Sequence, residues 1–317
     1  MSEYQLETKH LKKYFKTGSG LLHAVDDVNI AIRPGRTLGV VGESGCGKST
    51  LGRVVLRLLE ATEGEIYYNG EDIRKYSANQ MKQLRTKMQL IFQDPYSSLN
   101  PRLTISEIIA EPIKVCGILK HKDEINDRVH ELMRTVGIAE RLYHAYPHEL
   151  DGGRRQRVGI ARALSVSPEF IVCDEPVSSL DVAIQAQVLN LLMDLQEEKK
   201  LTYMFITHDL SVVKHISTEI AVMYLGQCVE RAKTDDLFDD PKHPYTKALL
   251  QAIPTTDIYR KIDSSALIKG EVTSPINPKP GCRFAARCKY ATERCKEPVE
   301  LKDLGGEHFV ACHLYDA

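Results

Sequence analysis

Short apolar runs separated by polar or glycine-rich turns recur along the chain and predict both strands and helices. Residues 4–35 alternate polar and apolar side chains, which indicates antiparallel strands with a turn near residues 18–20. Continuous apolar runs predict buried strands at 37–41, 170–173 and 203–206. Apolar positions at helical spacing predict mainly helical structure over 104–160, an amphipathic helix over 182–195 and a short helix over 246–253.

A glycine-rich stretch lies between the strand predicted at 37–41 and a helical apolar pattern at 51–59. It fits the phosphate-binding pattern G-x-x-x-x-G-K-[ST], and the flanking strand and helix argue against a chance glycine turn. Backbone N–H groups can close around phosphate oxygens at glycines, and the helix N-terminus adds partial positive charge. Lys48 would reach the β- and γ-phosphates, and the Ser49 hydroxyl would hold Mg²⁺. The residues predicted to contact the nucleotide here are Gly42, Glu43, Ser44, Gly45, Cys46, Gly47, Lys48, Ser49 and Thr50.

Polar side chains follow three of the later apolar runs. Gln93 could bind Mg²⁺ or orient an attacking water, although in isolation a surface glutamine is the favoured explanation. Asp174 can hold Mg²⁺ and Glu175 can polarise water, which is the Walker B pattern. His208 ends a run where ligands bind in parallel sheets, with a structural role as the alternative.

Gly152 and Gly153 open another predicted helix, which runs through Leu164. Glycines at a helix start expose backbone N–H groups, so this position is a candidate second anion site. An ordinary helix capped by Asp151 is the alternative.

Composition narrows the class of protein. The chain has 317 residues, 43% of them apolar, and a net charge of −1, so a basic nucleic-acid-binding surface is not expected. No apolar run approaches the length of a membrane-spanning helix, and the N-terminus lacks the pattern of a signal peptide. We therefore expect a cytosolic chain with reduced thiols.

Four of the eight cysteines, Cys282, Cys288, Cys295 and Cys312, cluster near the C-terminus. In a reducing compartment, clustered cysteines favour metal or iron–sulfur ligation over disulfides. Four thiolates would suit a 4Fe–4S cluster or tetrahedral zinc, and free thiols are the remaining alternative.

The order of motifs over residues 4–240 resembles the nucleotide-binding subunits of ABC transporters. The matching motifs are Walker A, a Q-loop at Gln93, a signature loop at 150–156, Walker B, a D-loop at 178–181 and an H-switch at His208. The resemblance implies an α/β P-loop ATPase domain at 1–240. This domain would have a parallel sheet core, an antiparallel β subdomain and a helical subdomain at about 97–165.

The same resemblance implies how the site works. Two subunits would hold ATP between Walker A of one and the signature loop of the other, with Phe15 stacking on adenine and Tyr14 as the alternative. Glu175 would activate water, Lys48 and Mg²⁺ would stabilise charge, and His208 would sense the γ-phosphate.

The signature loop departs from the usual L-S-G-G-Q, because Asp151 and Arg154 replace its serine and glutamine. An ionised aspartate cannot donate to the γ-phosphate and would repel it. We therefore expect a heterodimer whose partner ATPase supplies a standard signature loop.

Residues 241–317 resemble the C-terminal region of the oligopeptide/dipeptide transporter ATPases. The similarity rests on H-P-Y-T at 243–246, on the cysteine-rich run with its closing Cys-His, and on residues 93–101. Some family members carry a 4Fe–4S cluster on these cysteines, which places iron–sulfur ahead of zinc.

The resemblance implies an ATPase that powers peptide import from the cytoplasmic face of the inner membrane. Its partners would be a second ATPase subunit, two permease subunits and an extracytoplasmic substrate-binding protein. An importer of nickel, glutathione or sugar is the alternative. A soluble ABC ATPase acting on nucleic acid would need fused cassettes, an inserted arm or a basic patch, and the sequence contains none of these.

Overall fold

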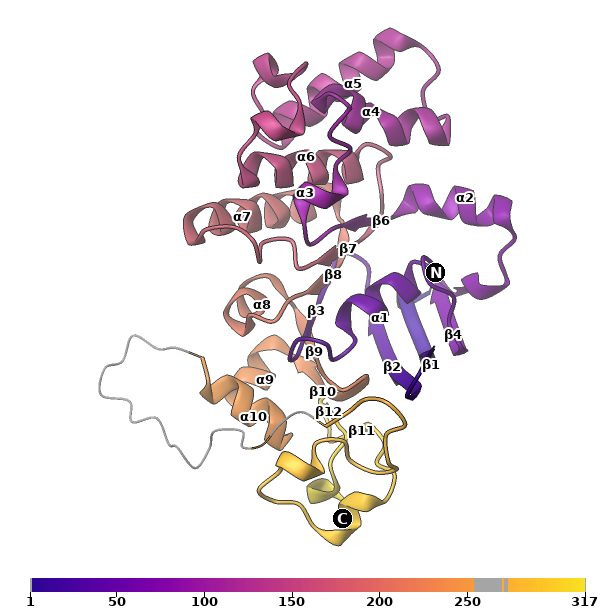
Figure 1. Ribbon diagram of the computed structural model, residues 1–317, viewed down its shortest axis with the longest axis vertical. Coiled ribbons are helices and arrows are strands. Elements are labelled where there is room, and N and C mark those ends of the chain that lie inside the picture. The colour runs from indigo at the N-terminus through magenta and orange to yellow at the C-terminus, as the bar shows by residue number, and fades with distance from the viewer. Residues whose placement is uncertain (1, 254–269, 271–272, 317) are drawn as a thin grey trace. The chain divides into compact units, whose positions relative to one another are not determined.

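The structure is a computed structural model that describes residues 2–253, 270 and 273–316 (Figure 1). It contains two compact units, each discontinuous in sequence. The first unit comprises Met1–Ile32, Thr37–Glu71 and Ile206–Ala317, and the second comprises Arg33–Arg36 and Asp72–Phe205. The predicted division at residue 240 separates an ATPase domain from an extension along the chain, and it stays a prediction.

The first unit begins with a long antiparallel hairpin. β1 (Leu6–Thr17) pairs with β2 (Gly20–Ile32), which confirms the strands and the turn predicted from alternation. β4 (Glu63–Tyr68) pairs with the other edge of β1, and the short β5 (Glu71–Asp72) follows it. Sequence analysis gave no element between residues 60 and 87.

A second sheet of the first unit carries the phosphate-binding loop. β3 (Thr37–Val41) is buried at all five positions, as predicted, and runs parallel to β9 (Glu219–Tyr224). β10 (Gln227–Lys233) forms a hairpin with β9, and the tight turn between them has positive φ at Leu225 and Gly226. The C-terminal strands extend this sheet beyond β10, in the order β12 (Phe309–Val310) and then β11 (Lys302–Asp303).

Four short helices belong to the first unit. α1 starts directly after the glycine-rich loop and ends at Val55, four residues before the end of the predicted pattern. The helix predicted over 246–253 begins earlier, at Pro244, because the proline occupies the first helical position. The helices are α1 (Lys48–Val55), α8 (Leu210–Ile216), α9 (Thr234–Asp239) and α10 (Pro244–Gln251).

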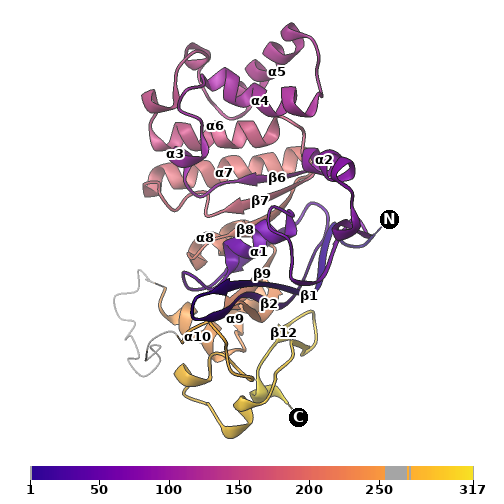
Figure 2. The same ribbon diagram turned by 45° about the vertical axis from the view of Figure 1, so that its right-hand side comes forward.

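The second unit contains three neighbouring strands. β6 (Met88–Ile91) runs parallel to β7 (Phe170–Asp174), with Met88 opposite Phe170 and Ile91 opposite Cys173. β8 (Thr202–Ile206) lies on the other side of β7. The side-by-side course of β6 and β7 is visible next to α7 in Figure 2.

The remaining helices lie in the second unit and confirm the predicted helical region at 104–160. α4, α5 and α6 pack against one another (Figure 1), and α4 buries Ile108, Ile109 and Ile113 between its neighbours. Thr104 and Glu107 form a capping box at the start of α4. The helices are α2 (Ala78–Lys87), α3 (Pro95–Ser98), α4 (Ile105–Cys116), α5 (Lys122–Thr135), α6 (Gly152–Leu164) and α7 (Val182–Lys199).

Two features fix the C-terminal segment to the first unit. The Glu230 carboxylate on β10 is fully buried, and it accepts hydrogen bonds from the N–H groups of Lys242 and His243 and contacts His308 at 2.7 Å. Asn277 exchanges hydrogen bonds with the backbone of Leu21 at 2.8 and 2.9 Å. No helix within the described ranges is long and apolar enough to cross a membrane.

Candidate functional site

The glycine-rich loop between β3 and α1 has a conformation that requires glycine at two positions. Gly42 has φ +151°, and a Cβ there would lie 2.1 Å from the carbonyl oxygen of Met223. Gly47 has φ +103°, and a Cβ there would lie 1.9 Å from the carbonyl oxygen of Ala24. The close approach of neighbouring backbone therefore explains these two glycines directly.

Lys48 points back into this loop. Its ammonium donates to the carbonyl oxygens of Gly42 at 2.8 Å and Glu43 at 3.0 Å, and the residue is 5% exposed. The N-cap of α1 is Gly47, which has no side chain to cap the helix. The loop thus offers a buried cation and helix N–H groups to an incoming anion.

The structure places the H-switch candidate near this loop within the first unit. The N–H of Thr207 donates to the carbonyl oxygen of Val40 at 3.1 Å, next to the end of β3. The exposed His208 follows immediately, and Asp209 then caps α8. His208 and the phosphate loop therefore leave neighbouring chain segments at the same edge.

The two aromatic candidates for adenine stacking have different surroundings. The Tyr14 ring stacks on His23 with 4.0 Å between ring centroids, and its hydroxyl donates to Asp26. Burial and the hydrogen bond to Asp26 both raise the pKa of Tyr14. Phe15 is half-buried, with the ammonium of Lys13 4.9 Å from its ring centroid. Because the Tyr14 ring is already stacked on His23, Phe15 is the better placed of the two to stack on adenine.

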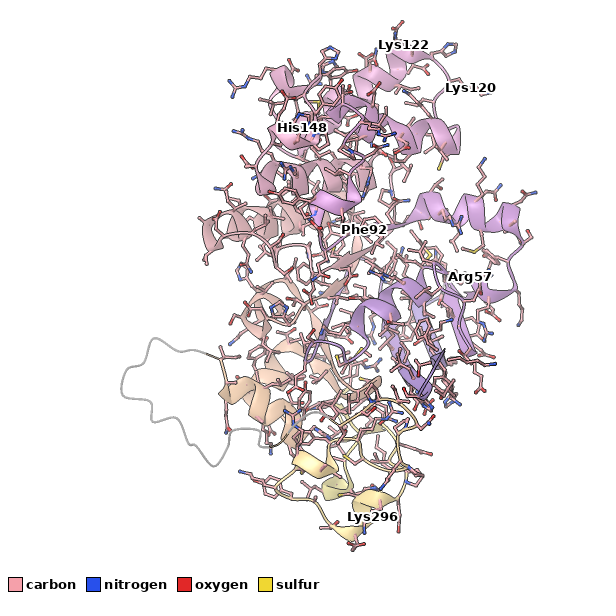
Figure 3. All side chains as sticks on the ribbon, viewed as in Figure 1. Arg57, Phe92, Lys120, Lys122, His148 and Lys296 are labelled. Carbon is pink, nitrogen blue, oxygen red and sulfur yellow. The ribbon has the colours of Figure 1, made fainter. Side chains whose placement is uncertain are left out.

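The Q-loop and Walker B candidates meet in the second unit. The side-chain amide of Gln93 donates to the carboxylate of Glu175 at 2.9 Å. Parallel pairing of β6 and β7 produces this contact, because both residues follow the carboxyl ends of adjacent strands. Phe92, labelled in Figure 3, precedes Gln93 and lies under the Arg162 guanidinium at 5.4 Å.

Walker B combines a buried carboxylate with an unusual backbone. Asp174 is 3% exposed at the end of β7. Glu175 has φ +47°, a left-handed conformation that non-glycine residues rarely adopt outside functional sites. The hydroxyl of Ser178 donates to the carbonyl oxygen of Glu175 at 3.2 Å, so the D-loop begins in contact with Walker B.

The signature loop forms the capped helix start that was one of its two interpretations. Asp151 accepts a hydrogen bond from the N–H of Arg154 at 2.7 Å, and the Arg154 side chain lies 3.5 Å from the same carboxylate. A Cβ at Gly153 would lie 2.5 Å from the Ile184 side chain, which explains the glycine by packing against α7. Both charged side chains are about half exposed, at 59% and 49%.

The predicted metal centre on the four clustered cysteines is wrong. All four lie within the described residues, and those residues contain no group of three or more His, Cys, Asp or Glu side chains that could hold a metal ion. The arrangement of the described residues therefore supports neither the iron–sulfur cluster nor its zinc alternative. Burial raises the pKa of Cys282 to about 11 and also raises the pKa values of Cys288 and Cys312.

Comparison with known families agrees with the geometry of the phosphate loop and of the Walker B region. A family model described as "ABC transporter" matches residues 25–178, and one described as "Oligopeptide/dipeptide transporter, C-terminal region" matches residues 229–295. The oligopeptide transport ATP-binding protein AppF of Bacillus subtilis (strain 168) is 49% identical, with 98% of this chain and 97% of that protein covered. This chain belongs to the ABC transporter family. It is an ATPase.

Other relatives and solved structures support the same family. The dipeptide transport ATP-binding protein DppF of Escherichia coli (strain K12) is 46% identical, covering 98% of this chain and 94% of that protein. The cassette MJ0796, solved as a dimer in a post-hydrolysis state with ADP and Pi, has a TM-score of 0.67 and 30% identity. It covers 72% of this chain and 98% of its own. The predicted fold class, a P-loop ABC nucleotide-binding domain, is confirmed.

Several contacts of the ABC ATPase site were not predicted from sequence. Arg287 forms an ion pair with Glu43 of the phosphate loop, and the Tyr245 hydroxyl accepts a hydrogen bond from the N–H of Glu43. Arg283 contacts Asp26 on β2. Tyr245 belongs to the H-P-Y-T block, which sequence analysis used only as a boundary marker. The two arginines carry no local signal, because their partners lie more than two hundred residues away.

Proposed function

We propose that this ATPase powers the import of peptides as a nucleotide-binding subunit of an ABC transporter. The observation that carries the proposal is the match of both family models, together with near full-length similarity to peptide transport ATP-binding proteins. The contacts of Lys48 within the phosphate loop and of Gln93 with Glu175 support the proposal.

In the proposed mechanism, the first unit binds ATP. The N–H groups of the loop from Gly42 to Thr50 and the Lys48 ammonium would hold the phosphates, while Phe15 would stack on the base. Lys48 would exchange its contacts with the carbonyl oxygens of Gly42 and Glu43 for phosphate oxygens. His208 would hydrogen-bond to the γ-phosphate from the end of the adjacent chain segment.

The second unit would supply the groups that act on water. Glu175 would accept a proton from the attacking water, and Gln93 would hold the Glu175 carboxylate through their 2.9 Å hydrogen bond. Ser49, Gln93 and Asp174 offer the hydroxyl, amide and carboxylate oxygens that Mg²⁺ prefers. Mg²⁺ would neutralise charge on the β- and γ-phosphates.

We further propose a heterodimer of ATPases. Gly152 and Gly153 would approach the nucleotide bound by a partner ATPase, but Asp151 would place a carboxylate there instead of a hydroxyl donor. The competent site would then combine this chain's phosphate loop, Glu175 and His208 with the partner's signature loop. Two permease subunits and an extracytoplasmic substrate-binding protein would complete an assembly at the cytoplasmic face of the membrane.

The two domains predicted along the sequence fit this assembly. Residues 1–240 would form the ATPase domain, with residues 97–165 as the helical subdomain, and residues 241–317 would form the extension.

Substitution of Glu175 tests the catalytic assignment. Glu175→Gln should lower ATP turnover about 100-fold or more while ATP binding is retained, because the amide cannot accept the proton. Turnover at the normal rate would contradict the role of Glu175. Hydrolysis by the chain alone at the rate of the mixed dimer would contradict the heterodimer.

Uptake tests the substrate class. The transporter, reconstituted in vesicles with ATP inside, should take up labelled peptides of two to five residues, and Glu175→Gln should abolish this uptake. Uptake of nickel, glutathione or sugars in place of peptides would overturn the peptide assignment while leaving the ATPase assignment intact.

A further inference from the structure

Glu43 in the phosphate loop is held from three sides, and two of the contacts come from the C-terminal part of the chain. Its N–H donates to the Tyr245 hydroxyl at 3.0 Å, from α10. Its carboxylate receives two hydrogen bonds from Arg287, at 2.8 and 3.1 Å. Its carbonyl oxygen accepts from Lys48 at 3.0 Å. The residue that contacts the phosphate-binding lysine is therefore fixed by segments more than two hundred residues away.

The contact between Arg287 and Glu43 is shielded from solvent. The side chain of Arg287 is 8% exposed and that of Glu43 is 27% exposed. The Nη1 atom of the guanidinium also donates to the hydroxyl of Tyr224 at 3.2 Å, so a nitrogen that binds Glu43 has a second partner. A bidentate pair in this setting fixes geometry as well as charge.

The turn that carries Arg287 is itself anchored. Arg283, four residues earlier, contacts Asp26 and the carbonyl oxygen of Leu225. Phe284 packs on the rings of Tyr224 and Tyr245 with 5.3 Å between centroids in each case. The short 3₁₀ turn at Ala285–Arg287 is thus fixed between the β2 strand, the hairpin turn after β9 and helix α10.

The charge of Glu43 matters because of where it lies. It follows Gly42 directly and belongs to the loop that closes around phosphates, so a bare carboxylate there would oppose a polyphosphate anion. Arg287 neutralises this carboxylate and prevents it from turning toward the ligand. The pairing also keeps the carbonyl of Glu43 in place for Lys48.

We propose that Arg287 is a positioning residue of the nucleotide site, which allows a glutamate in the phosphate loop by neutralising and orienting it. The ligand class that it serves is a nucleoside polyphosphate, and its effect grows with phosphate charge. This inference rests on the proposed ATP-binding role of the loop, and it gives the C-terminal segment a function in nucleotide binding.

A double-mutant cycle on the full chain tests the inference. Titration with ATP, ADP and AMP, with Mg²⁺ present, would be followed for wild type, Arg287→Ala, Glu43→Gln and the double variant. Arg287→Ala should raise the Kd for ATP about tenfold and for ADP about threefold, because an unpaired carboxylate repels charge. AMP binding should change little. In the Glu43→Gln background, Arg287→Ala should have almost no effect.

Two further variants complete the test. Arg287→Lys keeps the charge and should recover most of the ATP affinity, which separates electrostatics from misfolding. Arg294→Ala is the matched control, because Arg294 pairs with Asp316 in the same C-terminal segment at 54% exposure. Its Kd for ATP should equal that of wild type.

The outcomes distinguish the inference from the proposed function. Equal losses of affinity for ATP, ADP and AMP that persist in the Glu43→Gln background would show a merely structural role and overturn the inference. Unchanged ATP affinity in Arg287→Ala would overturn it as well, while leaving the ATPase assignment intact. Failure of the wild-type chain to bind ATP would instead contradict the proposed function.

Discussion

The phosphate loop and the signature loop both lead into a helix N-terminus, but they use its N–H groups differently. Before α1, the N-cap is Gly47, which makes no side-chain capping bond, and Lys48 is buried beside it. Before α6, the Asp151 carboxylate accepts the N–H of Arg154 and lies near its guanidinium. One helix keeps its positive end for a ligand, whereas the other binds a carboxylate of its own chain.

The comparison shows that the capping residue of a helix can change what the helix offers to a ligand while the local fold is kept. A capping aspartate stabilises α6 as well as serine would, and the glycines still fit against α7. The aspartate in place of serine at position 151 changes the charge that an incoming nucleotide would meet. We therefore expect substitutions in the two loops to have opposite consequences for ATP hydrolysis.

The largest expected effect comes from the phosphate loop. Lys48→Ala should lower ATPase activity about 100-fold or more, since the variant loses the buried cation that faces the phosphates. Lys122→Ala, at the exposed start of α5, is the matched control and should leave activity unchanged. ATPase assays and nucleotide titration would measure both variants. Normal hydrolysis by Lys48→Ala would remove the contrast between the loops.

Acid should weaken the support that His243 gives to the phosphate loop through Tyr245. Burial lowers the pKa of His243 from 6.5 to about 4, and its Nδ1 accepts the N–H of Tyr245. Between pH 6.5 and 4 the unfolded chain binds the extra proton, so stability should fall by about 3 kcal/mol as pH drops through this window and level off below it.

His243→Asn should flatten this slope, because asparagine caps a helix without titrating in that range. Urea unfolding at several pH values would measure how the free energy of unfolding of each variant depends on pH. An identical slope in wild type and His243→Asn would show that another group is responsible.

Restoring the hydroxyl tests the signature loop directly. Asp151→Ser should raise the ATPase rate of the chain's own dimer about tenfold, because the serine can donate to the γ-phosphate and the repelling charge is gone. The cap survives, so stability should stay the same. Steady-state ATPase assays of the chain alone would measure the gain. An unchanged rate would show that Asp151 does not limit this dimer.

The smallest effect concerns stability. Asp151→Ala should destabilise the chain by about 1 kcal/mol through loss of the N-cap of α6, whereas Asp151→Asn should cost much less. Thermal unfolding measures the difference. If alanine and asparagine behaved alike, the hydrogen bond to Arg154 would not support the helix, and the comparison with α1 would lose its structural basis.

The sequence predicted the elements whose signals are local. β3 and the strand ends before Gln93 and Glu175 were predictable, because apolar runs and turn residues mark them directly. The strand β4 and helix α2 were missed, although Ser77 and Gln80 form a capping box that a closer search would have found.

The errors and omissions at the site share a physical cause. The spacing of the cysteines suggested a metal centre. Whether their side chains can share a metal depends on their placement in the fold, which the spacing alone does not reveal. The contact of Arg287 with Glu43 depends on tertiary structure, and no local sequence pattern predicts it. The sequence supplied the candidate reacting groups, whereas the contacts that hold them in place required the structure.

The discontinuity of the first unit has a consequence for synthesis. Its opening strands leave the ribosome early, but the second unit is then translated before β9, β10 and β12 exist. Contacts between distant segments form slowly because a long loop must close first. Arg287 reaches Glu43 across 244 positions of sequence. A nascent or prematurely terminated chain would therefore contain the phosphate loop before Arg287, the residue that we propose neutralises Glu43, has been synthesised.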